Sequence, residues 1–132
     1  YCEKIKPDII IVDKADKINI AGNYNASHER IRELYRSLRE LAKRHDAALL
    51  GVSQASADAE GRTRIDFSML EGSKTGKAAE ADLIIGIGKH NGDGDDNSPN
   101  HDRFLNISKN KLSGYPGCVQ CVILPEVSRY AE

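Results

Sequence analysis

The run Ile9-Ile10-Ile11-Val12 constrains the fold more than any other stretch, because it places four β-branched residues in succession. Pro7 and Asp8 precede the run, and the carboxylate of Asp13 follows it. An apolar run this short, bounded by polar residues, predicts a strand that is buried on both faces of a parallel sheet. Asp13 then stands at the carboxyl end of the strand, where such sheets bind ligands.

Asp13 has two interpretations at this point. In nucleotide-hydrolysing folds, an acid at the end of such a strand holds the magnesium ion of a bound triphosphate, usually through water. Alternatively, Asp13 caps or turns the chain after a core strand. The stretch alone favours neither interpretation.

The length and charge of the chain set wider limits. Its 132 residues allow one domain with a substantial core, and 19 basic against 20 acidic residues give a net charge of −1. This balance neither requires nor excludes a nucleic-acid partner. No apolar run approaches the ~18 residues of a membrane span, and the N-terminal Tyr1-Cys2-Glu3-Lys4 is neither a signal peptide nor a start methionine. We therefore expect a piece of a longer cytoplasmic protein with no membrane partner.

The cysteines do not indicate a metal or redox site. Their number is three, and an odd count fits a reducing compartment better than a disulfide framework. Cys118 and Cys121 have CxxC spacing, but they fall in a predicted strand, where positions three apart face opposite sides.

A helix and a second strand follow the first strand. Ser27 offers an N-cap, and a helix is predicted from there to His45, since apolar residues recur at helical spacing on one face. These residues are Ile31, Leu34, Tyr35, Leu38, Leu41 and Ala42. The second buried strand, residues 47–52, ends in Ser53 and Gln54. Strand, helix and strand in this order predict a parallel crossover, which places Ser53 and Gln54 beside Asp13 at one edge of the sheet.

Residues 55–79 contain few large apolar side chains and no clear periodicity, so they predict a mobile binding loop or a partly disordered segment. Their basic side chains belong to Arg62, Arg64, Lys74 and Lys77. Two further strands are predicted at 81–87 and 103–108, and a turn-rich acidic segment, interpreted as a hairpin-like surface loop, lies between them. All four strands are expected to share one sheet.

The segment Gly72-Ser73-Lys74-Thr75-Gly76-Lys77-Ala78 superficially resembles a phosphate-binding loop. That motif requires four residues between its glycines and a serine or threonine after its lysine. Here three residues separate the glycines, and alanine follows Lys77. No apolar strand directly precedes the segment, so we do not interpret it as a Walker A motif.

Taken together, the order and spacing of these motifs resemble the DnaB-type replicative helicases over residues 6–114. The matching motifs are Ile-Ile-Ile-Val-Asp, the basic amphipathic helix, Gly-Val-Ser-Gln, Gly-Ser followed by Ala-Asp-Leu-Ile-Ile, and Ile-Ser-Lys-Asn-Lys-Leu-Ser-Gly. The resemblance implies an α/β fragment of a RecA-like P-loop NTPase core, with a mainly parallel sheet and flanking helices. It also implies a hexameric ring that uses ATP and Mg²⁺ to move along single-stranded DNA, in the cytoplasm of a bacterial or phage-infected cell.

The resemblance further implies roles for individual residues. Asp13 matches the Walker B aspartate, which holds magnesium through water, and Gln54, with Ser53 beside it, matches the glutamine that relays the state of the γ-phosphate. Gly72, Ser73, Lys74 and Lys77 match the loop that meets the DNA backbone, and Arg62 and Arg64 extend this basic region. Lys109 and Lys111 match two basic fingers that reach the nucleotide of a neighbouring subunit.

Two departures from the family pattern accompany these matches. Lys111 stands where the family usually has arginine, so it offers a point charge in place of a bidentate fork. The Walker A loop and the catalytic glutamate would belong to a part preceding Tyr1, so residues 1–132 match only the C-terminal part of an ATPase domain. We expect the isolated chain to be inactive. Another RecA-like ATPase, such as a recombinase, and a non-catalytic α/β binding module are the alternatives.

Overall fold

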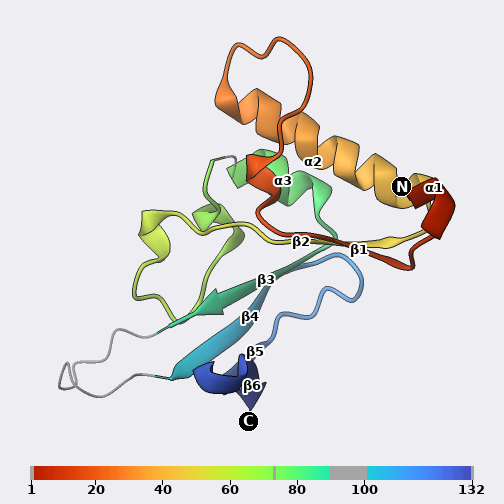
Figure 1. Cartoon of the computed structure of the whole chain (residues 1–132). Helices are drawn as coiled ribbons and strands as arrows, with labels where there is room; N and C mark the ends of the chain where they lie inside the picture. The colour runs from red at the N-terminus through yellow and green to blue at the C-terminus, as the bar shows by residue number, and fades with distance from the viewer. Residues whose placement is uncertain (1, 73, 90–100, 132) are drawn as a thin grey trace. The chain divides into compact units, whose positions relative to one another are not determined.

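The computed structural model describes residues 2–72, 74–89 and 101–131 (Figure 1). The chain forms two compact units. The first contains Tyr1–Gln54 and Leu70–Glu80, and the second contains Ala55–Met69 and Ala81–Glu132. Each unit is described here by itself.

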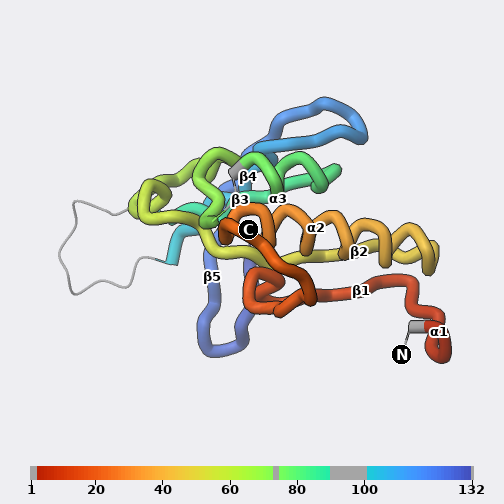
Figure 2. The backbone as a smooth tube through the Cα atoms, turned by 90° about the horizontal axis from the view of Figure 1, so that it is seen from above, coloured from red at the N-terminus to blue at the C-terminus, as the bar shows by residue number. Residues whose placement is uncertain are grey.

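The first unit contains two parallel strands joined by a long helix. Strands β1 (Ile9–Val12) and β2 (Ala48–Gly51) pair in register from Ile9 opposite Ala48 to Val12 opposite Gly51. Between them the chain forms α2 (Ser27–Arg44), and β1 and β2 run side by side in Figure 2. The predicted strand, helix and parallel strand are therefore confirmed. Two shorter helices, α1 (Cys2–Ile5) and α3 (Lys74–Glu80), complete the unit.

Helix α2 supplies the core of the first unit. Its residues Ile31, Leu34 and Leu38 are buried, as their helical spacing predicts. Leu34 and Leu38 pack with the buried Ala15 against partly buried side chains of both strands. Leu34 is 1% exposed, and complete burial of a leucine contributes about 1.5–3 kcal/mol. Figure 1 shows α2 lying along one face of the strand pair.

Two details of this unit differ from the predictions. Ala26 is the N-cap of α2 and makes no side-chain cap hydrogen bond, whereas Ser27 is the first helical residue. The predicted burial of β1 on both faces is also wrong for the described residues, since Ile9 and Ile11 are 61% and 67% exposed. The physical reason is the alternation of a strand, which turns these two side chains away from the face that α2 covers.

The second unit is built on an antiparallel sheet. Its strands are β3 (Leu83–Gly88), β4 (Asp102–Asn110), β5 (Cys118–Leu124) and β6 (Arg129–Ala131), in this order across the sheet. Cys118 is exposed and Cys121 is buried, so they face opposite sides as predicted.

The predicted mainly parallel sheet is therefore wrong. The described strands form one parallel pair and one antiparallel sheet of four, so the strands near Leu83 and Phe104 do not join the sheet of β1 and β2. The reason lies in the connections. A parallel neighbour needs a crossover of a dozen or more residues, usually helical, whereas short turns join antiparallel strands. Only seven residues, 111–117, separate β4 from β5.

The region 55–79 is more ordered than predicted. It contains the short 3₁₀ helices η2 (Ala57–Ala59) and η3 (Phe67–Met69), and it leads into α3. Two further 3₁₀ helices, η1 (Ala15–Lys17) and η4 (Pro125–Val127), follow β1 and β5. Residues 90–100, which include most of the predicted surface loop, lie outside the described residues.

Candidate functional site

The candidate site lies at the carboxyl edge of the strand pair in the first unit. Asp13 directly follows β1, and Ser53 and Gln54 follow β2. The Val52 amide donates to the Val12 carbonyl over 2.9 Å, so the pairing continues to this edge. The predicted neighbourhood of Asp13, Ser53 and Gln54 at one edge is consistent with this register.

The side chains of Asp13 and Gln54 are exposed, as a ligand site requires. The carbonyl of Gln54 accepts a hydrogen bond from the Glu71 amide over 3.1 Å, which ties the end of β2 to the segment before α3. A cavity of about 200 Å³ adjoins this edge. Its lining includes Gln54 and Gly72, with Lys14 and Lys17 from the loop after β1.

A buried polar cluster lies behind the edge. The Lys77 ammonium donates to Asp16 Oδ2 over 2.6 Å and to Ser53 Oγ over 2.8 Å. Ser53 Oγ also donates to Asp16 Oδ2 over 3.0 Å, and the Tyr35 hydroxyl donates to Asp16 Oδ1 over 3.0 Å. These four side chains, the Asp16 cluster, come from η1, the end of β2, α3 and α2.

The electrostatics of the Asp16 cluster follow from burial. Lys77 is 3% exposed, and a charge removed from water requires an opposite charge and hydrogen bonds. Asp16 supplies the charge, and the Tyr35 ring, whose centroid is 5.6 Å from the ammonium, adds a cation–π contact. Burial raises the pKa of Tyr35 above its ordinary value, and the adjacent Asp16 carboxylate raises it further.

This cluster gives Lys77 a place that the sequence did not predict. The family resemblance assigns Lys77 to the DNA contacts, but its ammonium is buried and bonded to Asp16 and Ser53. Residues 75–77, part of the dismissed phosphate-loop segment, lie inside α3. Of the rest of the predicted loop, Gly72 is exposed with φ of +83°, Lys74 begins α3, and Ser73 lies outside the described residues.

Arg62 and Arg64 are exposed on a segment of the second unit that lies against β3. The Asn106 side chain, 7% exposed, accepts from the Ile65 amide over 2.9 Å and donates to the Ile65 carbonyl over 3.0 Å. A Cβ on Gly86 would lie 2.5 Å from the Ile65 carbonyl oxygen, so only glycine permits this approach. The two arginines are therefore mounted on a fixed backbone.

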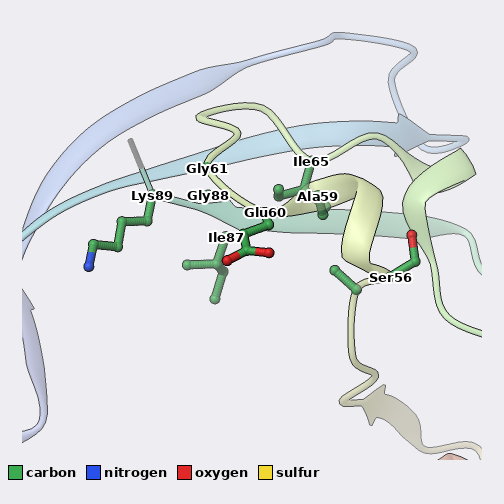
Figure 3. Close-up of a pocket in the computed structure, with 9 residues that line it drawn as sticks. Ser56, Ala59, Glu60, Gly61, Ile65, Ile87, Gly88 and Lys89 are labelled. Atoms are coloured by element: carbon green, nitrogen blue, oxygen red, sulfur yellow. The ribbon is translucent and has the colours of Figure 1, made fainter. Parts of the chain in front are cut away.

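A cavity of about 330 Å³ adjoins the same segment (Figure 3). Its lining includes Ser56, Glu60, Ile87 and Lys89. The Lys89 amide donates to the Arg62 carbonyl over 3.1 Å, which secures the end of β3 to the arginine-bearing segment.

The two predicted fingers occupy different local structures. Lys109 lies in β4 opposite Ile84, whereas Lys111 lies beyond Asn110, the last residue of β4. The Lys111 ammonium is 3.5 Å from Asp82 Oδ1, and the side chains of this pair are 44% and 50% exposed. The alternation of a strand therefore does not place both lysines on one face.

Asp13 is the predicted magnesium ligand. Among the residues with described positions, no group of three or more His, Cys, Asp or Glu side chains is arranged to hold a metal ion. A single exposed carboxylate fits a magnesium ion that takes its other ligands from water and a nucleotide.

None of the helices in the described part of the chain is long and apolar enough to cross a membrane.

Comparison with solved structures shows the fold. The solved ATPase domain of one DnaB-like helicase matches with a TM-score of 0.77 and 22% identity over 94% of this chain and 44% of that chain. A DnaB-like replicative helicase, whose structure addresses its interactions with primase, matches with a TM-score of 0.78 and 22% identity over 93% of this chain and 30% of that one. No protein-family model and no curated protein matches the sequence.

The chain thus spans less than half the length of either solved chain. The predicted resemblance is confirmed at the level of the fold, which is that of part of a DnaB-like helicase ATPase domain.

Proposed function

We propose that this chain is part of an ATP-dependent DNA helicase, in which it contributes one portion of the nucleotide site and one portion of the DNA-binding surface. The observation that carries the proposal is the placement of Asp13 and Gln54 directly after two paired parallel strands. In open α/β sheets, ligands bind beyond the carboxyl ends of such strands. The likeness to helicase ATPase domains supports the choice of ligand.

Asp13 is the proposed magnesium residue. Its exposed carboxylate would hold the ion of an ATP–Mg²⁺ complex through water. When bound, the ion neutralises charge that develops on the phosphates. Asp13 itself orients the water ligands of that ion, and its negative charge keeps the cation at this edge.

Gln54 is the proposed relay, with Ser53 fixing the chain beside it. The amide side chain of glutamine both donates and accepts hydrogen bonds, so Gln54 would respond to the presence of a phosphate oxygen. Its backbone is anchored by the Glu71 amide at 3.1 Å, and Ser53 is anchored by Lys77 at 2.8 Å. A displacement at Gln54 would therefore reach the segment that leads into α3.

The DNA contacts proposed for this chain are Arg62, Arg64, Gly72, Ser73 and Lys74. They would bind phosphate oxygens of a single strand, with little sequence preference. Lys77 is not included, because its ammonium is buried in the Asp16 cluster. Lys109 and Lys111 are proposed to act across a subunit boundary on the neighbour's nucleotide, in a hexameric ring.

The test is the ATPase activity of the full-length protein with and without single-stranded DNA. We expect Asp13→Asn to abolish DNA-stimulated hydrolysis, since the magnesium loses its charged anchor. Asp8→Asn is the matched control, because Asp8 is an exposed carboxylate at the opposite end of β1. Hydrolysis that survives Asp13→Asn, or a protein that binds DNA without any hydrolysis, would overturn the proposal.

A further inference from the structure

The Asp16 cluster joins three segments through one ammonium group. Lys77 projects from α3, Asp16 belongs to the loop after β1, and Ser53 follows β2. The Nζ atom of Lys77 lies within 2.6 Å of Asp16 Oδ2 and 2.8 Å of Ser53 Oγ. No other side chain that the described part of the chain places in the cluster carries a positive charge at this point.

These contacts lie directly beside the two residues proposed for the nucleotide. Asp16 follows Asp13 by three positions, and Ser53 immediately precedes Gln54. The Ala15 amide donates to the Val52 carbonyl over 3.3 Å, so the two loops are also linked through their backbones. A change in the position of Lys77 would therefore move the supports of both Asp13 and Gln54.

Burial makes this link stiff. Lys77 is 3% exposed, and its ammonium has a carboxylate, a hydroxyl and an aromatic ring around it. An ammonium so placed cannot exchange its partners for water without exposing a buried charge. Helix α3, whose first residue Lys74 is a proposed DNA contact, is consequently fixed to the edge that carries Gln54.

We propose that Lys77 is a positioning residue, which acts through Asp16 and Ser53 to hold Asp13 and Gln54 in place and to couple α3 to ATP turnover. This inference rests on the proposed function. Lys77 touches neither nucleotide nor DNA in this role. Its effect is on the geometry of residues that do.

The experiment replaces Lys77 with methionine in the full-length protein, because methionine keeps much of the length of lysine and removes the charge. We expect DNA-stimulated kcat to fall on the order of 10–100-fold, as supporting groups around catalytic residues do. The KM for ATP and the Kd for single-stranded DNA should change less than about threefold. Lys77→Arg, which retains a charged donor, should recover part of the lost kcat. Lys43→Met, an exposed lysine in the last turn of α2, is the control and should leave kcat unchanged.

A second measurement tests the link without relying on hydrolysis. Amide hydrogen exchange at Ala15 and Val52 reports on the two loops, since both amides donate to backbone carbonyls there. In Lys77→Met their exchange should accelerate about tenfold or more, while amides at the centre of α2 keep their protection and so report an intact fold. Asp16→Asn should produce the same pattern if Lys77→Met does not fold.

The outcomes separate the two proposals. If Asp13→Asn abolishes hydrolysis but Lys77→Met retains wild-type kcat and wild-type exchange at Ala15 and Val52, the positioning inference is wrong and the proposed function stands. If Asp13→Asn retains hydrolysis, the proposed function is wrong. An equal loss of protection throughout α2 in both Lys77→Met and Asp16→Asn would make Lys77 a residue of general stability and would also overturn the inference.

Discussion

The Lys77 ammonium and the Asp16 carboxylate form an ion pair 2.6 Å long between residues 61 positions apart in the sequence. The two sides of the pair differ in exposure, because the side chain of Lys77 is 3% exposed and that of Asp16 is 21% exposed. Loss of water therefore falls mainly on Lys77. Asp16 keeps some contact with solvent and accepts hydrogen bonds from Ser53 and Tyr35 as well.

This asymmetry predicts unequal effects on stability. Asp16→Ala leaves a buried ammonium without its counter-charge and should lower the free energy of unfolding by about 3–5 kcal/mol. Lys77→Met should lower it by less, because the remaining carboxylate keeps two donors and partial exposure. Denaturant unfolding of each variant measures both values. Glu40→Ala is the control, since the exposed Glu40–Arg36 pair should contribute under about 1 kcal/mol. Equal losses in Asp16→Ala and Lys77→Met would contradict the assigned burial.

Tyr35 predicts a dependence of stability on alkaline pH. Its pKa is raised by burial above the ordinary value of about 10. The unfolded chain therefore releases the phenol proton first, and stability that is fully present below pH of about 10 is lost as the pH rises through the folded pKa. Tyr35→Phe should remove this component, so the free energy of unfolding of that variant should fall less steeply above pH 10.

Ultraviolet titration of the tyrosinate absorbance checks the same assignment in the folded state. The sequence contains five tyrosines. Tyr35→Phe should leave the amplitude between pH 9 and 11 unchanged, because Tyr35 does not ionise there, whereas Tyr115→Phe should reduce it, since Tyr115 is 70% exposed. A reduced amplitude in Tyr35→Phe would show that its hydroxyl titrates normally.

The sequence predicted the strand pair and α2 well, because local patterns determine them. Four β-branched residues specify β1, and the spacing of Ile31, Leu34 and Leu38 specifies the buried side of α2. The same parallel crossover brings Asp13 and Gln54 to one edge, so this part of the site followed from the order of elements alone.

The Asp16 cluster could not be predicted in the same way. Lys77 looked like a loop cation because glycine and polar residues surround it, and α3 has no apolar stripe of the usual kind. Its burial depends on Asp16, 61 positions away, and sequence patterns carry no record of such a pairing. The one available signal was the small size of its neighbours Gly76 and Ala78, which permits their burial. The direction of β3 was mispredicted for a related reason, because apolar content alone does not distinguish parallel from antiparallel strands.

Asn106 predicts how the arginine-bearing segment is held. Asn106→Leu keeps a similar volume but leaves the Ile65 amide and carbonyl without their partners. Each buried unpaired group costs about 1–3 kcal/mol, so unfolding should become easier by at least about 2 kcal/mol. Amide exchange at Ile65 should lose its protection in this variant. Asn110→Leu, at the end of β4, is the control and should leave Ile65 protected. Retained protection in Asn106→Leu would mean that another contact holds the segment.

The basic residues proposed for DNA predict a change in salt dependence. Replacing Arg62, Arg64 and Lys74 with alanine in the full-length protein should weaken single-strand binding equally for different sequences. Each lost phosphate contact should reduce the slope of log K against log salt by about 0.7. The matched control replaces Lys43 and Arg44, which are exposed basic residues in the last turn of α2. An unchanged slope in the first variant would leave its three residues as solvated charges.

Lys109 tests whether the nucleotide site is shared between subunits. A cation that acts across a subunit boundary on a transferring phosphoryl group typically contributes a factor of ~10³ or more to turnover, far beyond the effect of a surface charge on folding. Lys109→Ala in the full-length protein should therefore nearly abolish DNA-stimulated hydrolysis while nucleotide binding and thermal stability change little. Mixing this variant with Asp13→Ala should restore part of the activity, because some interfaces of a mixed ring pair an intact Asp13 with an intact Lys109. Lys111→Ala should have the smaller effect, since Lys111 lies outside β4 and 3.5 Å from the Asp82 carboxylate. If Lys109→Ala retains its turnover, or if mixing restores nothing, Lys109 does not act on a neighbour's nucleotide.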